Sequence, residues 1–346
     1  MIEGPFLVTG ATGFLGRHLL TTLHAASESF RALALVRDVD TWNSYNWTRS
    51  LHQVETLRGS VTETASWTSD ERLNGLSGIF HLAAVVRHSR ANSAEIYRTN
   101  VDGTLNMVRL AADHDCRMIF VSTTGTVACF RSQDSKADEN SPFCESEVSS
   151  WPYYHSKIQA ERRAMQLAKE LGVQLIIIRP PALLGPGDHR FRSTSNILRF
   201  LQGKLPFLIR GGIHFADVRD ATKALLRAMI LTEVPRPVYH LTGTACSIET
   251  FFKMVEEASG VRSPRWILPF RPAWLAAAVL HRLGILLNGS LLKALPDPVV
   301  IEMASRYWDA KSLFAEKQLG YVSRDALKTI ADTVDWLRKN HESLSL

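Results

Sequence analysis

The chain has few cysteines, and they follow no recognisable pattern. None of the four forms a Cys-x-x-Cys pair or lies in a paired histidine arrangement. Structural zinc sites and disulfide frameworks both depend on such spacing. We therefore predict no metal site and a reducing compartment for this protein.

A long uninterrupted apolar run is also lacking. The most apolar stretch, residues 272–295, contains the charged side chains of Arg282 and Lys293, whereas a membrane-spanning helix needs about 20 nearly uninterrupted apolar residues. Residues 1–10 lead directly into a strand and a glycine turn, which leaves no room for a signal peptide. We expect a cytoplasmic protein with no transmembrane segment. The apolar stretch could instead lie on a membrane surface or cover an apolar substrate.

Positive charge is in modest excess, with a formal net charge of +6 and a pI near 9.2. The basic residues are scattered and accompany no nucleic-acid-binding motif, so no nucleic acid partner is expected. The 45% hydrophobic content allows a large core in one large domain or two moderate ones.

Six short apolar runs predict the strands of a sheet. They are residues 6–8, 32–36, 79–82, 118–121, 175–178 and 238–241. Continuous apolar character is typical of parallel strands that are buried on both faces. Segments with helical composition and amphipathic spacing separate several of these runs, at 13–24, 94–113 and 153–171. This alternation predicts an α/β fold with a doubly wound parallel Rossmann sheet.

The composition changes after residue 179, where prolines and glycines predict a loop before further helical segments. Because the run 238–241 returns to the sheet, we expect a discontinuous, smaller and mainly helical C-terminal domain. The expected Rossmann domain comprises residues 1–180 plus about 213–246. The remaining residues, about 181–212 plus 247–346, would form the substrate-binding region.

A glycine-rich turn, TGATGFLG at 9–16, follows the first predicted strand and opens a helix. Gly10 permits a tight turn, Gly13 lets the backbone approach a pyrophosphate, and Gly16 lets the helix pack closely on the sheet. The pyrophosphate would lie at the positive end of the helix. A turn without a ligand is the alternative for this motif taken alone.

The end of the second strand is where a dinucleotide fold reads the adenosine ribose, about 20 residues beyond the glycines. Arg37 occupies this position and Asp38 follows it. An arginine pairs with a 2′-phosphate, whereas a carboxylate would bind a 2′-hydroxyl and repel phosphate. Arg37 therefore favours NADP(H), and Asp38 leaves NAD(H) as the alternative.

Tyr153 and Lys157 lie four residues apart, on one face of a predicted helix. A phenol with a pKa of about 10 is a weak acid or base at neutral pH, and an ammonium one turn away would favour the phenolate. Tyr153 could then exchange a proton with a substrate oxygen. An incidental pair on a helix surface is the alternative for the spacing alone.

Hydroxyl side chains follow the strand 118–121, at the edge where open α/β sheets bind ligands. They belong to Ser122, Thr123 and Thr124. A hydroxyl there could orient a substrate carbonyl, and a plain Ser/Thr-rich turn is the alternative. The position between the glycine loop and the Tyr-Lys pair favours the functional interpretation.

Taken in order, these segments resemble the extended short-chain dehydrogenase/reductase family, also described as the NAD-dependent epimerase/dehydratase superfamily. The matching segments are TGATGFLG at 9–16, HLAA at 81–84, TNVDGT at 99–104, VSTTGTV at 121–127, YYHSK at 153–157 and RPPALLGPGD at 179–188. DVRDATKAL at 217–225 is similar to the branch that contains dihydroflavonol reductases and cinnamoyl-CoA reductases. The 3β-hydroxysteroid dehydrogenases form a similar group.

The resemblance implies that Tyr153 is the acid/base and that Lys157 holds the nicotinamide ribose and lowers the pKa of the tyrosine. Thr123 would complete the triad, although counting back from Val127 selects Thr124 instead. The expected cofactor-binding residues are Gly10, Thr12, Gly13, Phe14, Leu15, Gly16, Arg37, Leu82, Ala83, Ala84, Ser122, Tyr153, Lys157 and Pro180.

One segment departs from the family pattern. Many relatives carry an aspartate after the third strand to contact adenine, whereas this chain has Gly-Ser-Val at 59–61. We therefore expect the adenine contact to be weaker or supplied by other residues. Dimerisation through helices that flank the sheet is usual for the family, so a homodimer is also expected.

Three functions are compatible with these features. The first is an NADP(H)-dependent ketone reductase or alcohol dehydrogenase with an apolar substrate, walled by the C-terminal apolar segment; a plain core helix is the alternative for that segment. The second is a nucleotide-sugar epimerase or dehydratase with tightly bound NAD. Its diphosphate would be held by Arg190, Arg192, Arg199 and Arg210. The third is a non-catalytic NADP-sensing protein, which would have no need of a proton-transfer pair.

Overall fold

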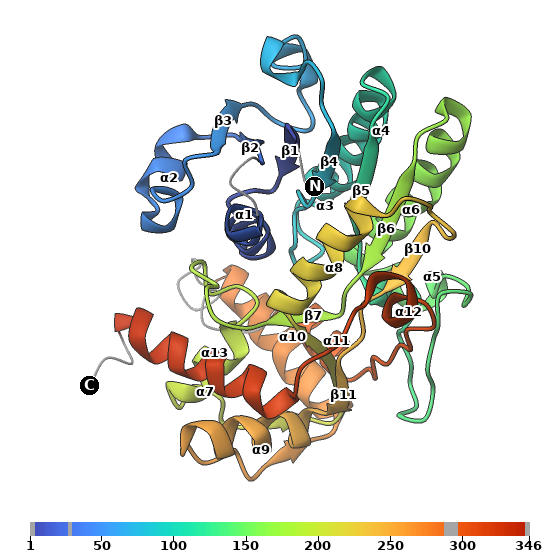
Figure 1. Cartoon of the computed structure of the whole chain (residues 1–346). Coiled ribbons are helices and arrows are strands. Elements are labelled where there is room, and N and C mark those ends of the chain that lie inside the picture. Colours follow the sequence, from blue (N-terminus) through green and yellow to red (C-terminus); the bar gives the residue numbers. More distant parts are fainter. Residues whose placement is uncertain (1–3, 27–29, 287–296, 343–346) are drawn as a thin grey trace.

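A seven-stranded parallel sheet forms the centre of the computed structural model, which describes residues 4–26, 30–286 and 297–342 (Figure 1). The strand order is β10-β6-β5-β4-β1-β2-β3, and every neighbouring pair runs parallel. The strands are β1 (Phe6–Thr9), β2 (Ala32–Val36), β3 (Val54–Arg58), β4 (Gly78–His81), β5 (Arg117–Val121), β6 (Leu175–Arg179) and β10 (Val238–His240). The predicted doubly wound sheet is confirmed, and each of the six apolar runs contributes one of its strands.

Helices cover both faces of this sheet (Figure 1). α1 (Phe14–Ala26) and α8 (Val218–Ile230) pack together on one face, and α4 (Gly103–Asp113) and α6 (Pro152–Leu171) on the other. Successive strand side chains point to opposite faces, so Val8 lies in the core under α1 and α8 while Leu7 lies in the core under α4 and α6.

The edge strand β3 shows why one strand left no apolar run in the sequence. Its residues alternate in burial, and only Leu57 is fully buried. The short helix α2 (Val39–Ser44) lies between β2 and β3 along the chain. Because an edge strand has only one sheet neighbour and faces more solvent, its polar content obscures the strand pattern.

The helix expected over 94–113 is continuous, but its middle is not α-helical. It consists of α3 (Ser93–Tyr97), a π-helical turn at Arg98–Asp102 and α4. π turns of this kind frequently mark functional positions in helices. The turn contains Asn100, a fully buried side chain that faces the candidate site.

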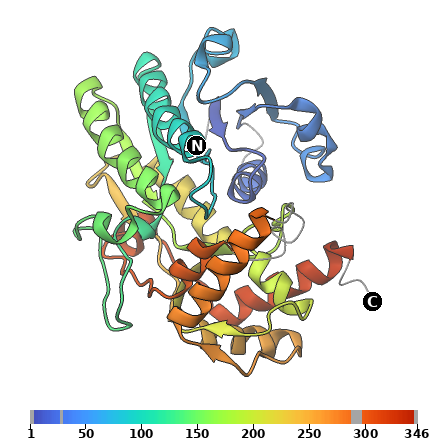
Figure 2. The same ribbon diagram turned by 180° about the vertical axis from the view of Figure 1, so that it is seen from behind.

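A smaller domain lies beside the carboxyl edge of the main sheet (Figures 1 and 2). It contains a three-stranded sheet and a two-stranded sheet: β7 (Ala182–Leu184), β9 (Gly212–Asp217) and β11 (Thr244–Ser247), then β8 (Leu208–Ile209) and β12 (Ile267–Leu268). Its helices are α7 (Ser195–Leu201), α9 (Ile248–Ser259), α10 (Phe270–Leu286), α11 (Pro298–Ala304) and α13 (Ala326–Asn340). Two further short helices, α5 (Glu145–Val148) and α12 (Ala315–Leu319), contact α6 and α8 respectively.

The expected domain boundaries near 213 and 246 fall inside β9 and β11, which pair with each other in the smaller sheet. The apolar stretch 272–295 forms most of α10 up to residue 286, and its last part, from 287, lies outside the described residues. Within the described ranges, no helix combines the length and the apolar character needed to cross a bilayer.

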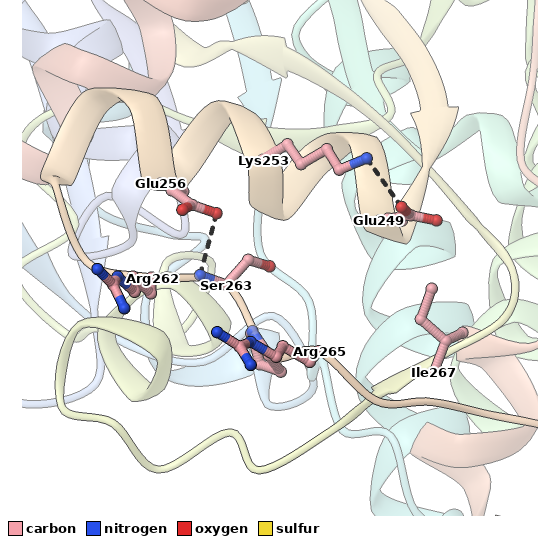
Figure 3. Close-up of a pocket in the computed structure, with 8 residues that line it drawn as sticks. Glu249, Lys253, Glu256, Arg262, Ser263, Arg265 and Ile267 are labelled. Atoms are coloured by element: carbon pink, nitrogen blue, oxygen red, sulfur yellow. Dashed lines mark hydrogen bonds and ion pairs between the residues drawn. The ribbon is translucent and has the colours of Figure 1, made fainter.

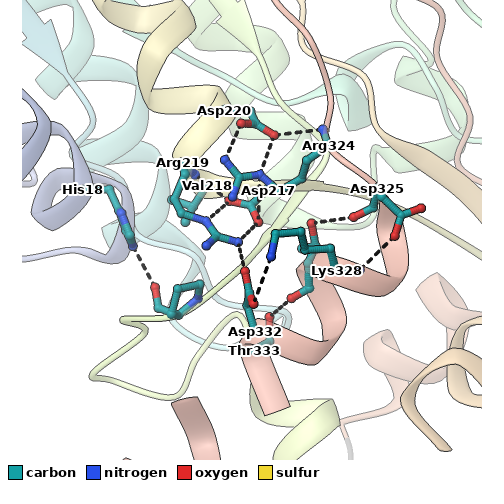
Figure 4. Close-up of polar contacts among 12 residues, drawn as sticks. His18, Asp217, Val218, Arg219, Asp220, Arg324, Asp325, Lys328, Asp332 and Thr333 are labelled. Atoms are coloured by element: carbon teal, nitrogen blue, oxygen red, sulfur yellow. Dashed lines mark hydrogen bonds and ion pairs between the residues drawn. The ribbon is translucent and has the colours of Figure 1, made fainter. Parts of the chain in front are cut away.

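The DVRD segment forms a network of ion pairs between α8 and the C-terminal part of the chain (Figure 4). Asp217 caps α8 by accepting from the backbone N–H of Arg219 at 2.8 Å. The Arg219 guanidinium reaches both Asp217 at 2.6 Å and Asp332 of α13 at 2.7 Å. Arg324 donates to Asp220 at 2.6 and 2.9 Å. Because Asp217 and Asp220 are buried, removing a partner would leave a desolvated carboxylate.

We expect Arg324→Met to lower the free energy of unfolding by about 2 kcal/mol, a moderate value because Arg324 is partly exposed. Lys328→Met is the matched control: Lys328 lies on the surface, 3.9 Å from Asp332, and its loss should change stability by less than about 0.5 kcal/mol. Urea denaturation measures both variants. Equal effects would show that the DVRD network does not hold the domains together.

Candidate active site

The glycine loop is shaped by close backbone contacts. Gly10 has a φ of +69°, and a Cβ atom there would lie 2.7 Å from the backbone of Leu82 and Ala83. A Cβ atom at Gly16 would lie 2.4 Å from the carbonyl oxygen of Gly10. Only glycine permits these approaches, which bring the loop against the end of β4 and α1 against the loop.

The loop also has the shape that a pyrophosphate requires. A Cβ atom at Gly13 would meet a single described atom, the Gly10 carbonyl oxygen at 3.1 Å, so the other side of Gly13 is open to a ligand. The first N–H groups of α1, from Phe14 onward, have no carbonyl acceptor within the helix. They lie at the positive end of the helix dipole, where an anion is favoured. The residues present therefore fit a dinucleotide cofactor.

A buried chain of hydrogen bonds starts at the end of β1. Thr9 Oγ1 lies 2.8 Å from Nδ1 of His81, and Nε2 of His81 lies 3.0 Å from Thr104 Oγ1. Burial and then the charge of Lys157 lower the pKa of His81 to about 3, so the ring is neutral. Thr104 donates its proton to the carbonyl oxygen of Asn100, so Nε2 must be the protonated nitrogen.

The same chain of hydrogen bonds continues to α6. Asn100 holds the backbone N–H and carbonyl of Val85 through its side-chain amide, at 2.8 and 3.2 Å. Its amide nitrogen also donates to Ser156 Oγ at 2.9 Å, and Ser156 donates to the carbonyl oxygen of Tyr153 at 2.7 Å. The glycine loop, the loop after β4 and the start of α6 are thereby joined by satisfied buried hydrogen bonds, which fix their relative positions.

Tyr153 and Lys157 lie on α6 at the carboxyl edge of the sheet. Lys157 is buried, donates from Nζ to the carbonyl oxygen of Val121 at 2.8 Å, and lies 4.7 Å from the ring centre of Phe120. Burial lowers its pKa to about 8, and Glu161 opposes this shift. The expectation that Lys157 lowers the pKa of Tyr153 is corrected here: burial raises that pKa to about 12, so the phenol is protonated at neutral pH.

The two neighbouring tyrosines differ in their surroundings. The Tyr154 ring stacks on Trp308 at 5.1 Å between ring centres and packs against Gly125, where a Cβ atom would lie 2.2 Å from the ring. Tyr153 instead meets the edge of His88, with ring centres 5.7 Å apart. Tyr154 therefore has a packing role. Tyr153, whose ring has different neighbours, is the candidate for proton transfer.

The three hydroxyl residues after β5 occupy different environments. Ser122 donates to Glu161, a buried carboxylate that also binds the guanidinium of Arg179. Thr123 is half-buried and accepts from the backbone N–H of Gly125 at 3.2 Å, which leaves its proton for another acceptor. Thr124 is almost fully buried, and its backbone N–H donates to the Pro180 carbonyl at 3.0 Å.

The ends of β2 and β3 carry two exposed arginines, Arg37 and Arg58. Asp38 is the N-cap of α2, where its carboxylate accepts from the backbone N–H of Asp40 and from the Thr41 hydroxyl. The Thr41 hydroxyl is the main cause of the lowered pKa of Asp38. The Asp38 carboxylate, which left NAD as the alternative, thus makes its hydrogen bonds to the first turn of α2.

Trp67 explains the departure at 59–61. Its indole is fully buried and donates to the carbonyl oxygen of Ser60 at 2.9 Å. A Cβ atom at Gly59 would lie 2.3 Å from this ring, so only glycine fits beside it. The segment where relatives carry an acidic residue is therefore packed against an indole here.

His88 is a feature of the site that the sequence did not reveal. Its ring lies edge-on to Tyr153 and is stacked 6.2 Å from Tyr154. Nδ1 is buried, and no described protein atom bonds to it. Burial lowers the pKa of His88, so the imidazole is neutral and can accept or donate one hydrogen bond. No spacing rule predicts this residue, because it lies in an irregular loop.

The arginines expected to hold a sugar-nucleotide diphosphate lie on separate elements. Arg190 donates to the Tyr45 hydroxyl at 3.2 Å and Arg192 is exposed in the same loop, whereas Arg199 lies on α7 and Arg210 follows β8. No three His, Cys, Asp or Glu side chains in the described ranges are arranged to hold a metal ion.

An open depression of about 560 Å³ lies beside α9 (Figure 3). Glu249 pairs with Lys253 there, and Glu256 accepts from the backbone N–H of Ser263. This depression shares no residue with the glycine loop or with the Tyr-Lys pair.

The chain is similar to known proteins over most of its length. Residues 6–239 match the NAD dependent epimerase/dehydratase family. A putative dihydroflavonol 4-reductase from Synechocystis sp. is 27% identical, with 97% of this chain and 95% of that protein aligned. A 4-hydroxy-2-methyl-3-oxo-4-farnesyl-3,4-dihydroquinoline-1-oxide ketoreductase from Stigmatella aurantiaca is also 27% identical, over 92% of this chain and 91% of that protein.

Solved structures share the whole fold. The crystal structure of gox2253 superposes with a TM-score of 0.80 at 26% identity and covers 98% of this chain and 99% of its own. MoeE5 in complex with UDP-glucose and NAD gives a TM-score of 0.71 at 22% identity, over 97% and 99% of the two chains. At 22% identity, the similarity to MoeE5 shows a shared fold only.

We expect Tyr153→Phe to lower turnover at least 100-fold while nicotinamide nucleotide binding changes little, because only the transferable proton is removed. Tyr154→Phe is the matched control at the adjacent position and should retain most activity, since its ring packing is preserved. Steady-state rates together with nucleotide titration separate the two effects. Comparable losses in both variants would contradict the assignment of Tyr153.

Lys157 should make stability depend on pH. Its folded pKa of about 8 lies below the unfolded value of about 10.4, so the unfolded chain binds more protons between these values. The free energy of unfolding should therefore rise with pH from about 8 to 10, by about 2 to 3 kcal/mol relative to Lys157→Met. Parallel urea titrations across this range measure the difference, and a flat difference would mean that Lys157 is not desolvated.

Proposed function

Because the chain belongs to the NAD dependent epimerase/dehydratase family, and is an NAD(P)-dependent enzyme of the extended short-chain dehydrogenase/reductase type, we propose that it reduces a ketone on an apolar small molecule with NADPH. The observation that carries this proposal is the protonated phenol of Tyr153 on α6, one helical turn before the buried ammonium of Lys157. The pair lies on the same sheet edge as a glycine loop that fits a dinucleotide.

The raised pKa of Tyr153 suits a proton donor. A phenol that is protonated at neutral pH can give its proton to a carbonyl oxygen as that oxygen becomes an alkoxide. Lys157 Nζ uses one N–H to hold the Val121 carbonyl and keeps its other protons for the phenolate and the nicotinamide ribose. The bound cofactor supplies the hydride.

Thr123 remains the third member of the proposed triad. Its hydroxyl oxygen is held by the Gly125 N–H, so its proton can point at the substrate oxygen and share the negative charge that develops there. Thr124 is the alternative, and its burial makes it less accessible to a substrate. His88, beside Tyr153, is placed to bond a second polar group of the substrate.

The preference for NADP(H) rests on charges at the ends of β2 and β3. Arg37 and Arg58 are exposed there, and Asp38 is engaged in capping α2. Two guanidinium groups can pair with a 2′-phosphate, which carries negative charge that a carboxylate would repel. Arg37 would also stack on the adenine in place of the acidic contact absent from 59–61.

The apolar character of the substrate is supported by the groups around Tyr153. Tyr154, Trp308 and Trp151 form an aromatic cluster beside it. Two relatives carry names of reductases that act on ring systems, a dihydroflavonol in one case and a farnesyl quinoline in the other. Pockets for such ligands are lined mainly by apolar and aromatic side chains with a few polar groups.

A nucleotide-sugar epimerase or dehydratase with retained NAD is the second candidate. It is favoured by the fold shared with MoeE5, whose complex contains UDP-glucose and NAD. Against it, Arg190, one of the four arginines expected to hold its diphosphate, is bonded to the Tyr45 hydroxyl. A sensor without turnover is the third candidate, and an intact Tyr-Lys proton-transfer pair would then serve no purpose.

We expect Arg37→Ala to weaken NADPH binding about tenfold or more and to leave NADH binding nearly unchanged, because one charge-assisted contact to phosphate is lost. Arg49→Ala is the control, since Arg49 is an equally exposed arginine that ends the short turn after α2. Nicotinamide fluorescence titrations give both affinities. A parallel loss for NADH would mean that Arg37 does not read the 2′-phosphate.

Turnover tests the reaction class. We expect NADPH oxidation with apolar cyclic ketones, such as flavanones or steroid ketones, and no reaction with nucleotide sugars. The assay follows absorbance of the reduced nicotinamide, with Tyr153→Phe as the inactive control. Activity confined to nucleotide sugars would overturn both the substrate class and the reductase assignment.

A further inference from the structure

The segment from Trp266 to Leu280 exposes an unusual amount of apolar surface. The side chains concerned, with their exposed fractions, are Trp266 (73%), Ile267 (36%), Phe270 (38%), Leu275 (60%), Val279 (47%) and Leu280 (40%). They are six of the thirteen large apolar side chains that are exposed in the described chain. Scattered exposed residues of this kind are ordinary, whereas a contiguous group marks an interaction surface.

α10 presents this surface because both of its faces are apolar. Ala273 and Ala277 are buried and pack against Ile209 and Ile301 of the smaller domain. Leu275 and Val279, one turn apart, lie on the opposite face and are exposed. In Figure 2, α10 is coloured orange and lies at the front of the smaller domain. An apolar helix face that the rest of the protein leaves exposed is expected to be covered by a partner or a membrane.

The sequence segment that carries this face is basic. Residues 258–296 contain five Lys or Arg and no Asp or Glu, so this stretch carries +5 of the net +6 of the whole chain. Basic residues are scattered along the whole chain, and this segment differs because it lacks acidic ones. Figure 3 shows that Glu249 bonds to Lys253 and Glu256 to the backbone of Ser263, with Arg262 and Arg265 lining the same depression. Arg271, at the start of α10, is also exposed.

We propose that the apolar face of α10, with the preceding Trp266 and Ile267, docks on an anionic lipid surface. Exposed apolar side chains would enter the interface while the flanking arginines pair with lipid phosphates. A tryptophan is suited to this boundary because its indole is amphipathic. This inference goes beyond the proposed reaction and does not depend on which substrate is reduced.

A lipid surface fits this face better than a second copy of the chain. In a two-fold dimer the same patch lies against itself. Arg262, Arg265 and Arg271 of one copy would then approach the same three arginines of the other, and like charges brought together in an interface oppose association. An anionic bilayer supplies both the apolar phase and the missing negative charge.

The docked helix is connected to the candidate active site. Trp274 of α10 donates to Glu302 at 2.9 Å, and Glu302 also accepts from Trp151 at 2.8 Å and from Arg90 at 2.6 Å. Trp151 is the N-cap residue of α6, which carries Tyr153. Docking would therefore place the site next to the lipid, where an apolar substrate is concentrated.

Vesicle flotation tests the proposal with the full chain, without cofactor or substrate. We expect binding to vesicles of 70% phosphatidylcholine and 30% phosphatidylglycerol, little binding to pure phosphatidylcholine, and weaker binding in 0.5 M NaCl as the charges are screened. The double variant Leu275→Ser/Val279→Ser should lose at least tenfold in partitioning. Val322→Ser, at an exposed apolar position outside this segment, is the control and should bind like the unmodified protein.

Thermal unfolding establishes that the variants are folded, which exposed substitutions should permit. Absence of binding to anionic vesicles, or equal binding by the double variant, would overturn the proposal. Sedimentation that shows a dimer which the double variant converts to a monomer would assign the face to a second copy and would overturn it too. Because no turnover is measured, failure here leaves the proposed reductase activity to its own test.

Discussion

The hydrogen-bond chain from Thr9 to the carbonyl oxygen of Tyr153 is the constraint on which the site depends. It passes through His81, Thr104, Asn100 and Ser156, all of them fully buried. A buried polar group without a partner costs about 1 to 3 kcal/mol, so the loss of one link destabilises its neighbours. The neutral ring of His81 accepts a hydrogen bond from Thr9 and donates one to Thr104. The chain thereby fixes the position of the glycine loop relative to α6.

Charged side chains join the two parts of the molecule, whereas the hydrogen-bond chain lies within the part built on the seven-stranded sheet. Arg219 and Arg324 hold α8 to the C-terminal residues, while Glu302 joins α10 to the start of α6. The DVRD residues that resemble a reductase branch therefore act in domain packing, with no contact to Tyr153 among the interactions described. Their resemblance gives information about architecture, and the substrate assignment depends on the surroundings of Tyr153 instead.

The parts of the fold and site that could be predicted from the sequence are those whose physical cause is local. A buried parallel strand needs a continuous apolar run, and Phe6–Thr9 has one, whereas β3 exposes most of its side chains and has none. The glycine loop and the Tyr-Lys spacing are also local. His88 and Glu302 could not be predicted, because their partners come from distant parts of the chain. The capping role of Asp38 could not be predicted either, because the short helix α2 was not expected from the sequence.

The nucleotide that accompanies the purified protein tests the central claim most directly. The protein is denatured, the released nucleotide is identified, and exchange is followed by titrating NADPH and NADH into undenatured protein. Our account predicts an empty or readily exchanging site that binds NADPH more tightly than NADH, as the exposed arginines at the ends of β2 and β3 favour a 2′-phosphate. NAD that remains bound through purification and does not exchange would contradict it and would favour an epimerase or dehydratase.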